Sequence, residues 1–213
     1  PMYGVLLAFK DYKMKLGILS SPWAGFKYFR QLFSTPSFFE VLRNTVSISL
    51  HRIIFGFPAP IILALLLNEI TAKRFKKTVQ TITYAPNFIA VVVMCGMILN
   101  FTSQTGGLIN NMITKLGGEA IPFMYKENLF PHIYVWTGVW QTMGYSAIVY
   151  LAALTGVPMD LYEAAKVDGA SKLRRILSID LPYIAPTIIT LFILNTGSIL
   201  SIGFEKVYLM QNS

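Results

Sequence analysis

Long apolar stretches separated by short polar ones constrain the fold of this chain more than any other feature. Residues 53–67 carry no charged or polar side chain, and a helix needs about 20 mostly apolar residues to cross the hydrocarbon core of a bilayer. The sequence predicts such spans over residues 44–67, 81–101, 132–154 and 183–202. Because each span must satisfy its own backbone hydrogen bonds, we expect an all-α membrane protein.

The composition supports a membrane protein over a soluble or nucleic-acid-binding one. The chain is 54% hydrophobic and only 13% charged, whereas about a quarter of the residues of a soluble domain are charged. Its net charge of +8 would suit nucleic acid, but most of the basic residues flank apolar segments. Such a distribution is typical of contact with membrane lipid, so no nucleic acid partner is expected.

Prolines and glycines predict where the helices bend or stop. Pro58 and Pro60 should distort the first span. The second span is expected to continue through Pro86. Residues 108–116 read as a short helix ended by two glycines. Residues 1–43 contain no apolar run long enough to span, and their interleaved aromatic and basic side chains favour an interfacial segment over a sugar-binding patch.

A charged, turn-forming stretch lies between the last two spans. Pro158 suits the first position of a helix, Gly169 suits a left-handed helix stop, and Ser171 can cap a second helix. Leu173 and Ile176 then recur at helical spacing and are expected to pack against the rest of the protein. The stretch predicts a helix-turn-helix outside the membrane core.

The same stretch carries a spaced motif of the pattern E-A-A, three residues, G, nine residues, I-x-L-P. It consists of Glu163, Ala164, Ala165, Gly169, Ile179, Leu181 and Pro182. This motif resembles the coupling loop of permease subunits in binding-protein-dependent ABC importers. The resemblance implies that these residues, with Asp168, contact an ATPase. The alternative is an ordinary amphipathic helical hairpin with a glycine turn.

Further blocks along nearly the whole chain are similar to the carbohydrate permeases of the maltose-type superfamily, the group for polysaccharides, oligosaccharides and aldouronate. They include FGFPAPIILALLLNE, RFKKTVQTITYAPNF and GSILSIGFEKVYLMQN. The resemblance implies a type I ABC importer transmembrane domain in the bacterial plasma (inner) membrane. That group has six spans, so we expect a partial chain with about four. Residues 1–43 would form an extracytoplasmic or interfacial segment and residues 44–213 the truncated permease domain, with its coupling loop at 155–182.

The resemblance also implies the partners and the mechanism. Two permease subunits, usually different, pair above two cytoplasmic ATPase subunits, and an extracytoplasmic solute-binding protein delivers an oligosaccharide. Closing of the ATPase dimer on ATP would then open the permeases outward. The sequence contains no GxxxxGK[ST] phosphate loop, so we expect a transport subunit with no ATP site or cofactor of its own.

Charge does not decide the orientation of the spans. With four spans, the loops at 68–78 and 155–182 share one side and carry eight Lys or Arg, and the opposite side also carries eight before Lys206 is counted. The family resemblance places the coupling loop in the cytoplasm, and we follow it.

Polar side chains in otherwise apolar spans are candidates for the cargo path. Sugars present hydroxyl edges and C–H faces, so a sugar site needs amides beside aromatic rings. The candidates are Trp140, Gln141, Tyr145, Asn100 and Asn195. The competing interpretation is that such residues anchor helices at the membrane interface or join them to one another. His51 and His132 are far apart in sequence with no ligand spacing, so no metal site is expected.

Two other functions compete with sugar import. The coupling motif alone fits an ABC importer permease for a peptide, an amino acid or an anion equally well. A membrane-embedded enzyme acting on lipids or glycans is the other alternative. It would need acids or bases near the membrane, and the four spans contain no Asp or Glu.

Overall fold

The structure is a computed structural model that describes residues 2–199, 201 and 203–211. These residues form helices and turns and, within that part of the chain, no strand, which agrees with the all-α prediction. Internal contacts divide the chain into a small unit, Pro1–Val46, and a large unit, Ser47–Ser213. Each unit is described by itself below.

Aromatic side chains hold the small unit together. Its helical segments are α1 (Met2–Val5), the 3-10 turn η1 (Leu6–Phe9), α2 (Gly17–Ser20) and α3 (Lys27–Ser34). The rings of Phe9 and Trp23 stack with centroids 5.7 Å apart. The Tyr28 hydroxyl donates a hydrogen bond of 2.6 Å to Asp11, and this bond lowers the pKa of the Asp11 carboxyl group.

The first membrane-spanning helix is longer than predicted and widens where a proline follows. The segments α4 (Pro36–His51), η2 (Arg52–Gly56) and α5 (Pro58–Asn68) form one helix of 33 residues, long and apolar enough to cross a membrane. Over Arg52–Gly56 the helix is π-type. Pro58 has no N–H to give to the preceding turn and its ring would clash there, which explains the wider turn. The predicted distortion is confirmed.

The last spanning helix also contains a π-type turn just before a proline. The segments α11 (Lys172–Arg175), η5 (Ile176–Asp180) and α12 (Leu181–Gly197) form one helix of 26 residues that is also long and apolar enough to span. Its π-type turn, η5, precedes Pro182. The helix therefore begins inside the charged stretch, before Tyr183, and ends at Gly197. The predicted end at Ile202 lies outside the described residues.

The second predicted span, 81–101, is wrong as one continuous helix. The segments α6 (Lys73–Tyr84) and α7 (Val91–Thr102) are separated by the 3-10 turn η3 (Ala85–Phe88) and bent by 100°. Pro86 lacks the N–H that a continuous helix would use, and the backbone is extended at Ile89. A second bent pair, at 81°, joins α9 (Phe130–Leu154) to α10 (Met159–Val167). The described residues thus provide two spanning helices, or up to four if each bent pair is one span.

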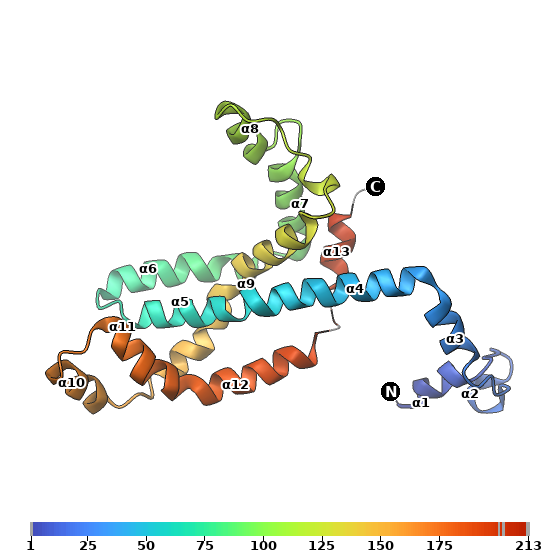
Figure 1. The fold of residues 1–213 in the computed structure, drawn as a ribbon, viewed down its shortest axis with the longest axis horizontal. Coiled ribbons are helices and arrows are strands. Elements are labelled where there is room, and N and C mark those ends of the chain that lie inside the picture. The colour runs from blue at the N-terminus through green and yellow to red at the C-terminus, as the bar shows by residue number, and fades with distance from the viewer. Residues whose placement is uncertain (1, 200, 202, 212–213) are drawn as a thin grey trace. The chain divides into compact units, whose positions relative to one another are not determined.

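Helix α9 is the centre of the large unit. Its 25 residues include the whole predicted third span, and it packs against α5, α6 and α12 (Figure 1). A side chain at Gly144 could not be accommodated, because its Cβ would lie 2.0 Å from the carbonyl oxygen of Thr83 on α6. This close approach fixes α6 against α9. Two apolar clusters fill the remaining space, one beside α7 and one between α5, α9 and α12.

The connection between α7 and α9 folds around one buried amide. It contains α8 (Leu108–Lys115), which matches the predicted short helix, and the 3-10 turn η4 (Phe123–Tyr125). The Nδ2 of Asn110 donates to the carbonyl oxygens of Ser103 and Ile121 at 3.0 and 2.9 Å, and its Oδ1 accepts from the Ile121 N–H at 2.8 Å. The buried Asn110 therefore closes this loop.

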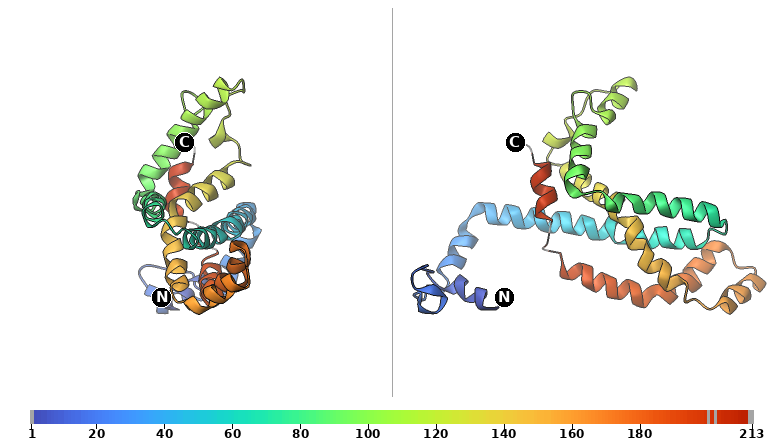
Figure 2. Two further views of the ribbon diagram at one scale, coloured as in Figure 1. Left: turned by 90° about the vertical axis from the view of Figure 1, so that its left-hand side faces the viewer. Right: turned by 180° about the vertical axis from the view of Figure 1, so that it is seen from behind.

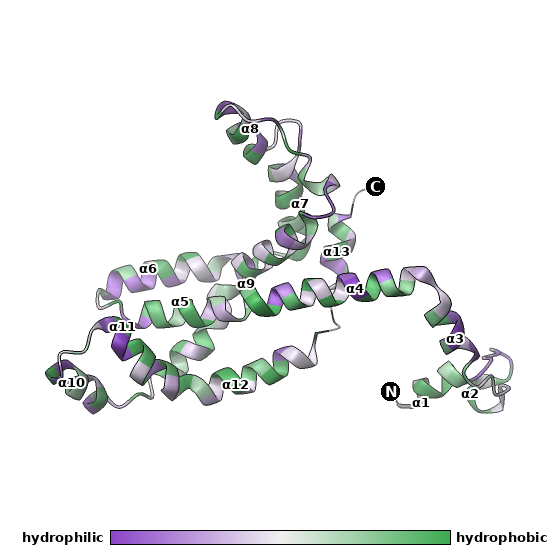
Figure 3. Ribbon diagram, in the orientation of Figure 1, coloured by the Kyte–Doolittle hydropathy of each residue, from purple (hydrophilic) through white to green (hydrophobic). Residues whose placement is uncertain are grey.

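Helix α12 extends from the turn between α10 and α11 to the neighbourhood of α13. Two views of the ribbon show the turn between α10 and α11 at one end of α12 and α13 (Phe204–Met210) near the other (Figure 2). Coloured by hydropathy, α5 and α12 are mostly apolar, whereas α11 and the start of α6 are hydrophilic (Figure 3). Ile189 and Ile193 of α12 are 58% and 62% exposed, as expected for side chains that face lipid.

Candidate functional site: a coupling turn and a polar cavity

The turn between α10 and α11 has the conformation that the sequence predicts. Helix α10 ends at Val167, and Gly169, the residue after its C-cap, is left-handed with a φ of 67°. The N–H of Gly169 bonds the carbonyl of Lys166 at 3.1 Å, and that of Ala170 bonds the carbonyl of Ala165 at 2.9 Å. This pair of bonds is a Schellman motif, which needs a left-handed residue. Ser171 caps α11 through the N–H of Arg174. Pro158 lies one position earlier than predicted, at the N-cap of α10.

The residues of the spaced motif separate into exposed and partly buried groups. Glu163, Ala164, Asp168, Gly169 and Pro182 are exposed, whereas Ala165, Ile179 and Leu181 are half-buried. A hollow of about 500 Å³ at this turn brings some of them together. Its lining includes Ala165, Asp168 and Ile179 together with Ala170, Arg174, Arg175 and Ser178.

The predicted packing stripe of α11 is only half right. Ile176 packs against the apolar cluster between α5, α9 and α12, but Leu173 is 65% exposed. The stripe therefore meets the rest of the large unit only where the helix reaches Ile176.

Polar bonds tie this turn to the end of α5, and sequence reasoning did not find them. Arg175 forms an ion pair of 2.9 Å with Glu69. The Nδ2 of Asn68 donates to the Tyr162 hydroxyl at 3.4 Å, and that hydroxyl donates to the fully buried Asp180. Burial, with the hydrogen bond to Asp180, raises the pKa of Tyr162 to about 12. The partners are distant in sequence, so no local pattern could indicate them.

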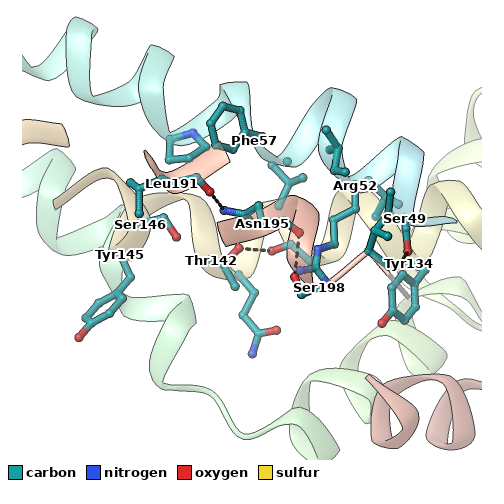
Figure 4. Close-up of a pocket in the computed structure, with 18 of the residues that line it drawn as sticks. Ser49, Arg52, Phe57, Tyr134, Thr142, Tyr145, Ser146, Leu191, Asn195 and Ser198 are labelled. Carbon is teal, nitrogen blue, oxygen red and sulfur yellow. Dashed lines mark hydrogen bonds between the residues drawn. The ribbon is translucent and has the colours of Figure 1, made fainter. Parts of the chain in front are cut away.

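A cavity of about 570 Å³ lies in the large unit beside the C-terminal end of α12 (Figure 4). Helices α9 and α12, the turn η2 and α13 supply most of its wall. Polar side chains are interspersed with aromatic rings along it: Ser49, Thr142, Ser146, Gln141, Asn195 and Ser198 with Phe57, Tyr134, Tyr145 and Tyr150.

Three of the five predicted cargo-path residues line this cavity, and two do not. Gln141, Tyr145 and Asn195 belong to its wall. Trp140 is 45% exposed and lies outside it, because adjacent helical residues point about 100° apart. Asn100 is also outside, and its amide bonds the carbonyl of Gly96 at 2.8 Å. Gln141 has a partner as well, since its Nε2 donates to the Ile89 carbonyl at 3.0 Å.

Two cationic side chains in the cavity wall were not predicted as site residues. Arg52 comes from the π-type turn η2 and Lys206 from α13. The Lys206 ammonium group donates to the Tyr134 carbonyl and to the Thr137 hydroxyl, both at 2.9 Å, and lies 4.6 Å from the centre of the Tyr134 ring. A side chain at Gly138 would meet it, with a Cβ 3.6 Å from Nζ. The signal available in the sequence was a charge within the first predicted span for Arg52 and a charge shortly after the last predicted span for Lys206.

The two histidines lie closer together than their sequence separation suggests. The rings of His51 and His132 meet edge to face with centroids 5.5 Å apart. Within the described part of the chain, no group of three His, Cys, Asp or Glu side chains is placed to hold a metal ion.

Proteins of similar sequence cover this chain from end to end. The permease protein YteP of the polygalacturonan/rhamnogalacturonan transport system of Bacillus subtilis (strain 168) is 46% identical over 213 residues, which are 100% of this chain and 66% of the relative. Protein LplB of the same organism is 45% identical over 100% of this chain and 67% of its own length. The chain thus spans about two thirds of the length of these curated relatives.

Solved structures agree with the sequence comparison. A bacterial ABC transporter involved in the import of the acidic polysaccharide alginate matches with a TM-score of 0.91 and 39% identity, over 100% of this chain and 71% of that one. The family of binding-protein-dependent transport system inner membrane components matches residues 56–204. This chain therefore belongs to the family of binding-protein-dependent transport system inner membrane components.

Proposed function

We propose that this chain is a membrane-spanning permease subunit of an ATP-driven ABC importer for oligosaccharides or complex carbohydrates. One observation carries the proposal: a continuous helix, Lys172–Gly197, joins a coupling-type turn at one end to a polar cavity at the other. The similar permeases for polygalacturonan/rhamnogalacturonan and the alginate importer support a carbohydrate cargo.

The proposed partners are a second permease subunit, two cytoplasmic ATPase subunits and an extracytoplasmic solute-binding protein. The binding protein is supported by the alginate transporter, which was also solved in complex with an alginate pentasaccharide-bound periplasmic protein and matches over 100% of this chain. The ATPase is supported by the similarity to a bacterial ABC transporter, a class of transporter driven by ATP. The energy for transport would then reach this chain only through contact with that ATPase.

In this proposal the exposed part of the turn docks on the ATPase, and the buried part carries movement into the membrane. The exposed Glu163 and Asp168 provide charges for an interface, and the small Ala164 allows close approach of a partner. Ile179 belongs to the apolar cluster that includes α9 side chains. A displacement of the docked turn would therefore move α12 against α9.

The cavity is the proposed cargo path, since its wall offers what a sugar requires. Gln141 and Asn195 supply amides, Thr142 and Ser146 supply hydroxyl groups, and Tyr145 supplies a ring. Its volume of about 570 Å³ lies within the range of small-molecule sites, roughly 300–1,000 Å³. A peptide, an amino acid or an anion is the alternative cargo.

Transport by the assembled importer tests the proposal. The full-length permease would be reconstituted in vesicles with its partner permease, ATPase and binding protein, and uptake of labelled oligosaccharides, peptides and amino acids would be measured with and without ATP. We expect ATP-dependent uptake of the oligosaccharides and no uptake of the peptides or amino acids. Uptake of peptides or amino acids in preference to sugars would contradict the carbohydrate assignment.

A charge reversal tests the coupling turn separately. Glu163→Lys should lower the amount of ATPase that co-purifies per permease and the ATP hydrolysis stimulated by substrate, while the permease itself stays in the membrane. Glu119→Lys is the matched control, because Glu119 is equally exposed but lies in the connection between α8 and α9. Normal ATPase recovery and normal ATP hydrolysis in Glu163→Lys would mean that Glu163 does not contact the ATPase.

A further inference from the structure

We propose that Tyr162 and Glu69 are positioning residues that tie the turn between α10 and α11 to α5, so that this turn moves two spanning helices, α5 and α12, together. The inference rests on the proposed function, since it concerns how movement of the docked turn reaches the cavity. Three features of the large unit carry it: the side-chain bonds between the turn and α5, the sparse packing of α10, and the course of both helices to the cavity.

An ion pair joins α11 to the end of α5. Glu69 is the C-cap residue of α5, and its Oε2 lies 2.9 Å from Nη2 of Arg175, the last residue of α11. The side chains of Glu69 and Arg175 are 15% and 23% exposed, so water and salt screen this pair less than a pair at the open surface. The partners are 106 residues apart in sequence, so the pair fixes two segments that the local chain does not hold together.

A second connection to α5 uses the neighbouring residue, Asn68. Its Nδ2 donates to the Tyr162 hydroxyl at 3.4 Å, and that hydroxyl donates to Oδ1 of Asp180. Asp180 is fully buried, and its Oδ2 has no hydrogen-bond partner among the described residues. The buried carboxylate therefore depends on the Tyr162 hydroxyl. Tyr162 of α10 thus contacts both the end of α5 and the π-type turn η5 that precedes α12.

Side chains, and not extended helix packing, hold α10 in place. In the part of the chain that the structure describes, α10 does not lie packed along α5, α9 or α12, and an 81° bend separates it from α9. Among the described residues of α10, Tyr162 is the one that packs against the apolar cluster between α5, α9 and α12. A force on the exposed side chains of α10 would therefore reach the neighbouring helices through Tyr162.

Both helices that meet at the turn continue to the cavity. The views of the ribbon show the end of α5 next to α11 (Figures 1 and 2). Helix α5 is part of the helix Pro36–Asn68, whose Gly56 lines the cavity roughly 18 Å along the axis from Asn68. Helix α12 is part of the helix Lys172–Gly197, and its Asn195 lines the cavity as well. A displacement of the turn would therefore move the cavity wall in two places, through α5 and through α12.

The amount of sugar imported per ATP hydrolysed tests the inference. The assembled importer, with the full-length permease, would be reconstituted in vesicles, and uptake of a labelled oligosaccharide and hydrolysis of ATP would be measured on the same preparation. Tyr162→Phe and Glu69→Gln should each lower this ratio by roughly two- to thirtyfold, the range for substitutions that alter coupling between distant sites. Recovery of the ATPase per permease should stay normal, because the exposed Glu163 is unchanged.

Tyr28→Phe is the matched control for Tyr162→Phe. The Tyr28 hydroxyl also donates to a carboxylate, that of Asp11, but both residues belong to the small unit, so the ratio should stay unchanged. Exchange of the two charges is the control for Glu69. Glu69→Arg alone should lower the ratio, and Glu69→Arg combined with Arg175→Glu should restore most of it, because the ion pair forms again in the opposite sense.

A covalent bridge tests whether the tie between α5 and α11 stays closed during transport. Glu69→Cys and Arg175→Cys would be combined in a permease whose other cysteines, Cys95 included, are replaced by serine. A short bifunctional thiol reagent would then join the two new cysteines. The bridged protein should import more sugar per ATP hydrolysed than the same protein before bridging.

The possible contradictions are distinguishable. If the variants lose uptake only in proportion to the amount of assembled complex, the bonds stabilise the fold and do not carry movement, and the inference is wrong. It is also wrong if the covalent bridge stops transport, because the ion pair would then have to open in each cycle. If the wild type imports no oligosaccharide with ATP, or if Glu163→Lys recovers the ATPase normally, the proposed function fails, and the inference fails with it.

Discussion

At the turn between α10 and α11, which we propose as the coupling turn, Arg175 lies 2.9 Å from Glu69, whereas in the cavity Arg52 and Lys206 have no carboxylate partner among the described residues. Both regions carry buried or half-buried cations, and both are connected to the same helix, α12. The difference lies in what compensates the charge. At the turn, Arg175 and Glu69 compensate each other within the chain, so this pair contributes to a fixed shape. In the cavity, neutral groups hold Lys206, and no carboxylate among the described lining residues compensates its charge or that of Arg52.

The same substitution in the two regions gives the largest expected contrast. Arg175→Met leaves Glu69 without a partner, and because the side chains are 23% and 15% exposed we expect a loss of about 1–3 kcal/mol, less than for a fully buried pair. Arg52→Met removes no ion pair and should cost less than about 0.5 kcal/mol. Thermal unfolding of the purified permease in detergent measures both. Equal losses of stability would mean that the charge of Arg52 is compensated within the chain as fully as that of Arg175.

The hydrogen bond between Tyr162 and Asp180 gives the next largest effect. Tyr162→Phe removes the donor from a buried carboxylate whose Oδ2 already lacks a hydrogen-bond partner among the described residues, so we expect a loss of about 1–2 kcal/mol. Because the pKa of Tyr162 rises from 10.0 to about 12 on folding, its contribution is complete below pH 10 and disappears as the pH rises toward 12. The unfolding temperature of the wild type should therefore fall across that range more than that of the phenylalanine variant. Parallel curves for the two proteins would contradict the assignment.

Within the cavity, variants of Gln141 and Tyr145 separate an effect on stability from an effect on transport. Its Nε2 donates to the Ile89 carbonyl, so Gln141→Leu should cost about 0.5–1.5 kcal/mol in stability. Tyr145→Phe removes only a hydroxyl group at an exposed ring and should leave stability unchanged. If both residues line the cargo path, apparent affinity for substrate should change in both variants, measured as uptake by the assembled importer. Normal uptake in both would place the path elsewhere.

Asn100 gives the smallest expected effect. Its amide bonds only the Gly96 carbonyl of its own helix, and it lies outside the cavity. Asn100→Ala should change stability by less than about 0.5 kcal/mol and leave uptake unaltered. A marked loss of uptake would restore the original assignment of Asn100 to the cargo path.

Local features of the fold were predictable, and contacts between distant segments were not. The glycine stop at Gly169 and the cap at Ser171 follow from backbone conformation and side-chain chemistry, which act over a few residues. The break near Pro86 was not predicted, because the apolar run after the proline, residues 91–99, dominated the hydropathy of the predicted span although residues 81–85 include two threonines. A hydropathy pattern indicates which residues are stable in lipid. It contains little information about whether the helix axis continues straight or bends between them.

The residues of the candidate site also separate into those that the sequence predicts and those that only contacts between distant segments reveal. Gln141, Tyr145 and Asn195 were found because polar groups are unfavourable in a bilayer. Arg52 and Lys206 were not predicted as site residues, because a long cationic side chain in or beside a span commonly extends its charged end toward the membrane surface. Only the packing of α13 beside α7 and α9 places Lys206 in the cavity wall.

The continuous helix Lys172–Gly197 has a mechanical consequence. Its 26 residues amount to a rod roughly 39 Å long. If the rod pivoted as a rigid body at its coupling end, a tilt of about 10° would displace the other end by roughly 7 Å, more than one helical turn. The π-type turn before Pro182 lies close to that pivot and is the natural place for the rod to flex. A small rotation imposed outside the membrane would thus suffice to widen or narrow the wall to which Asn195 and Ser198 belong.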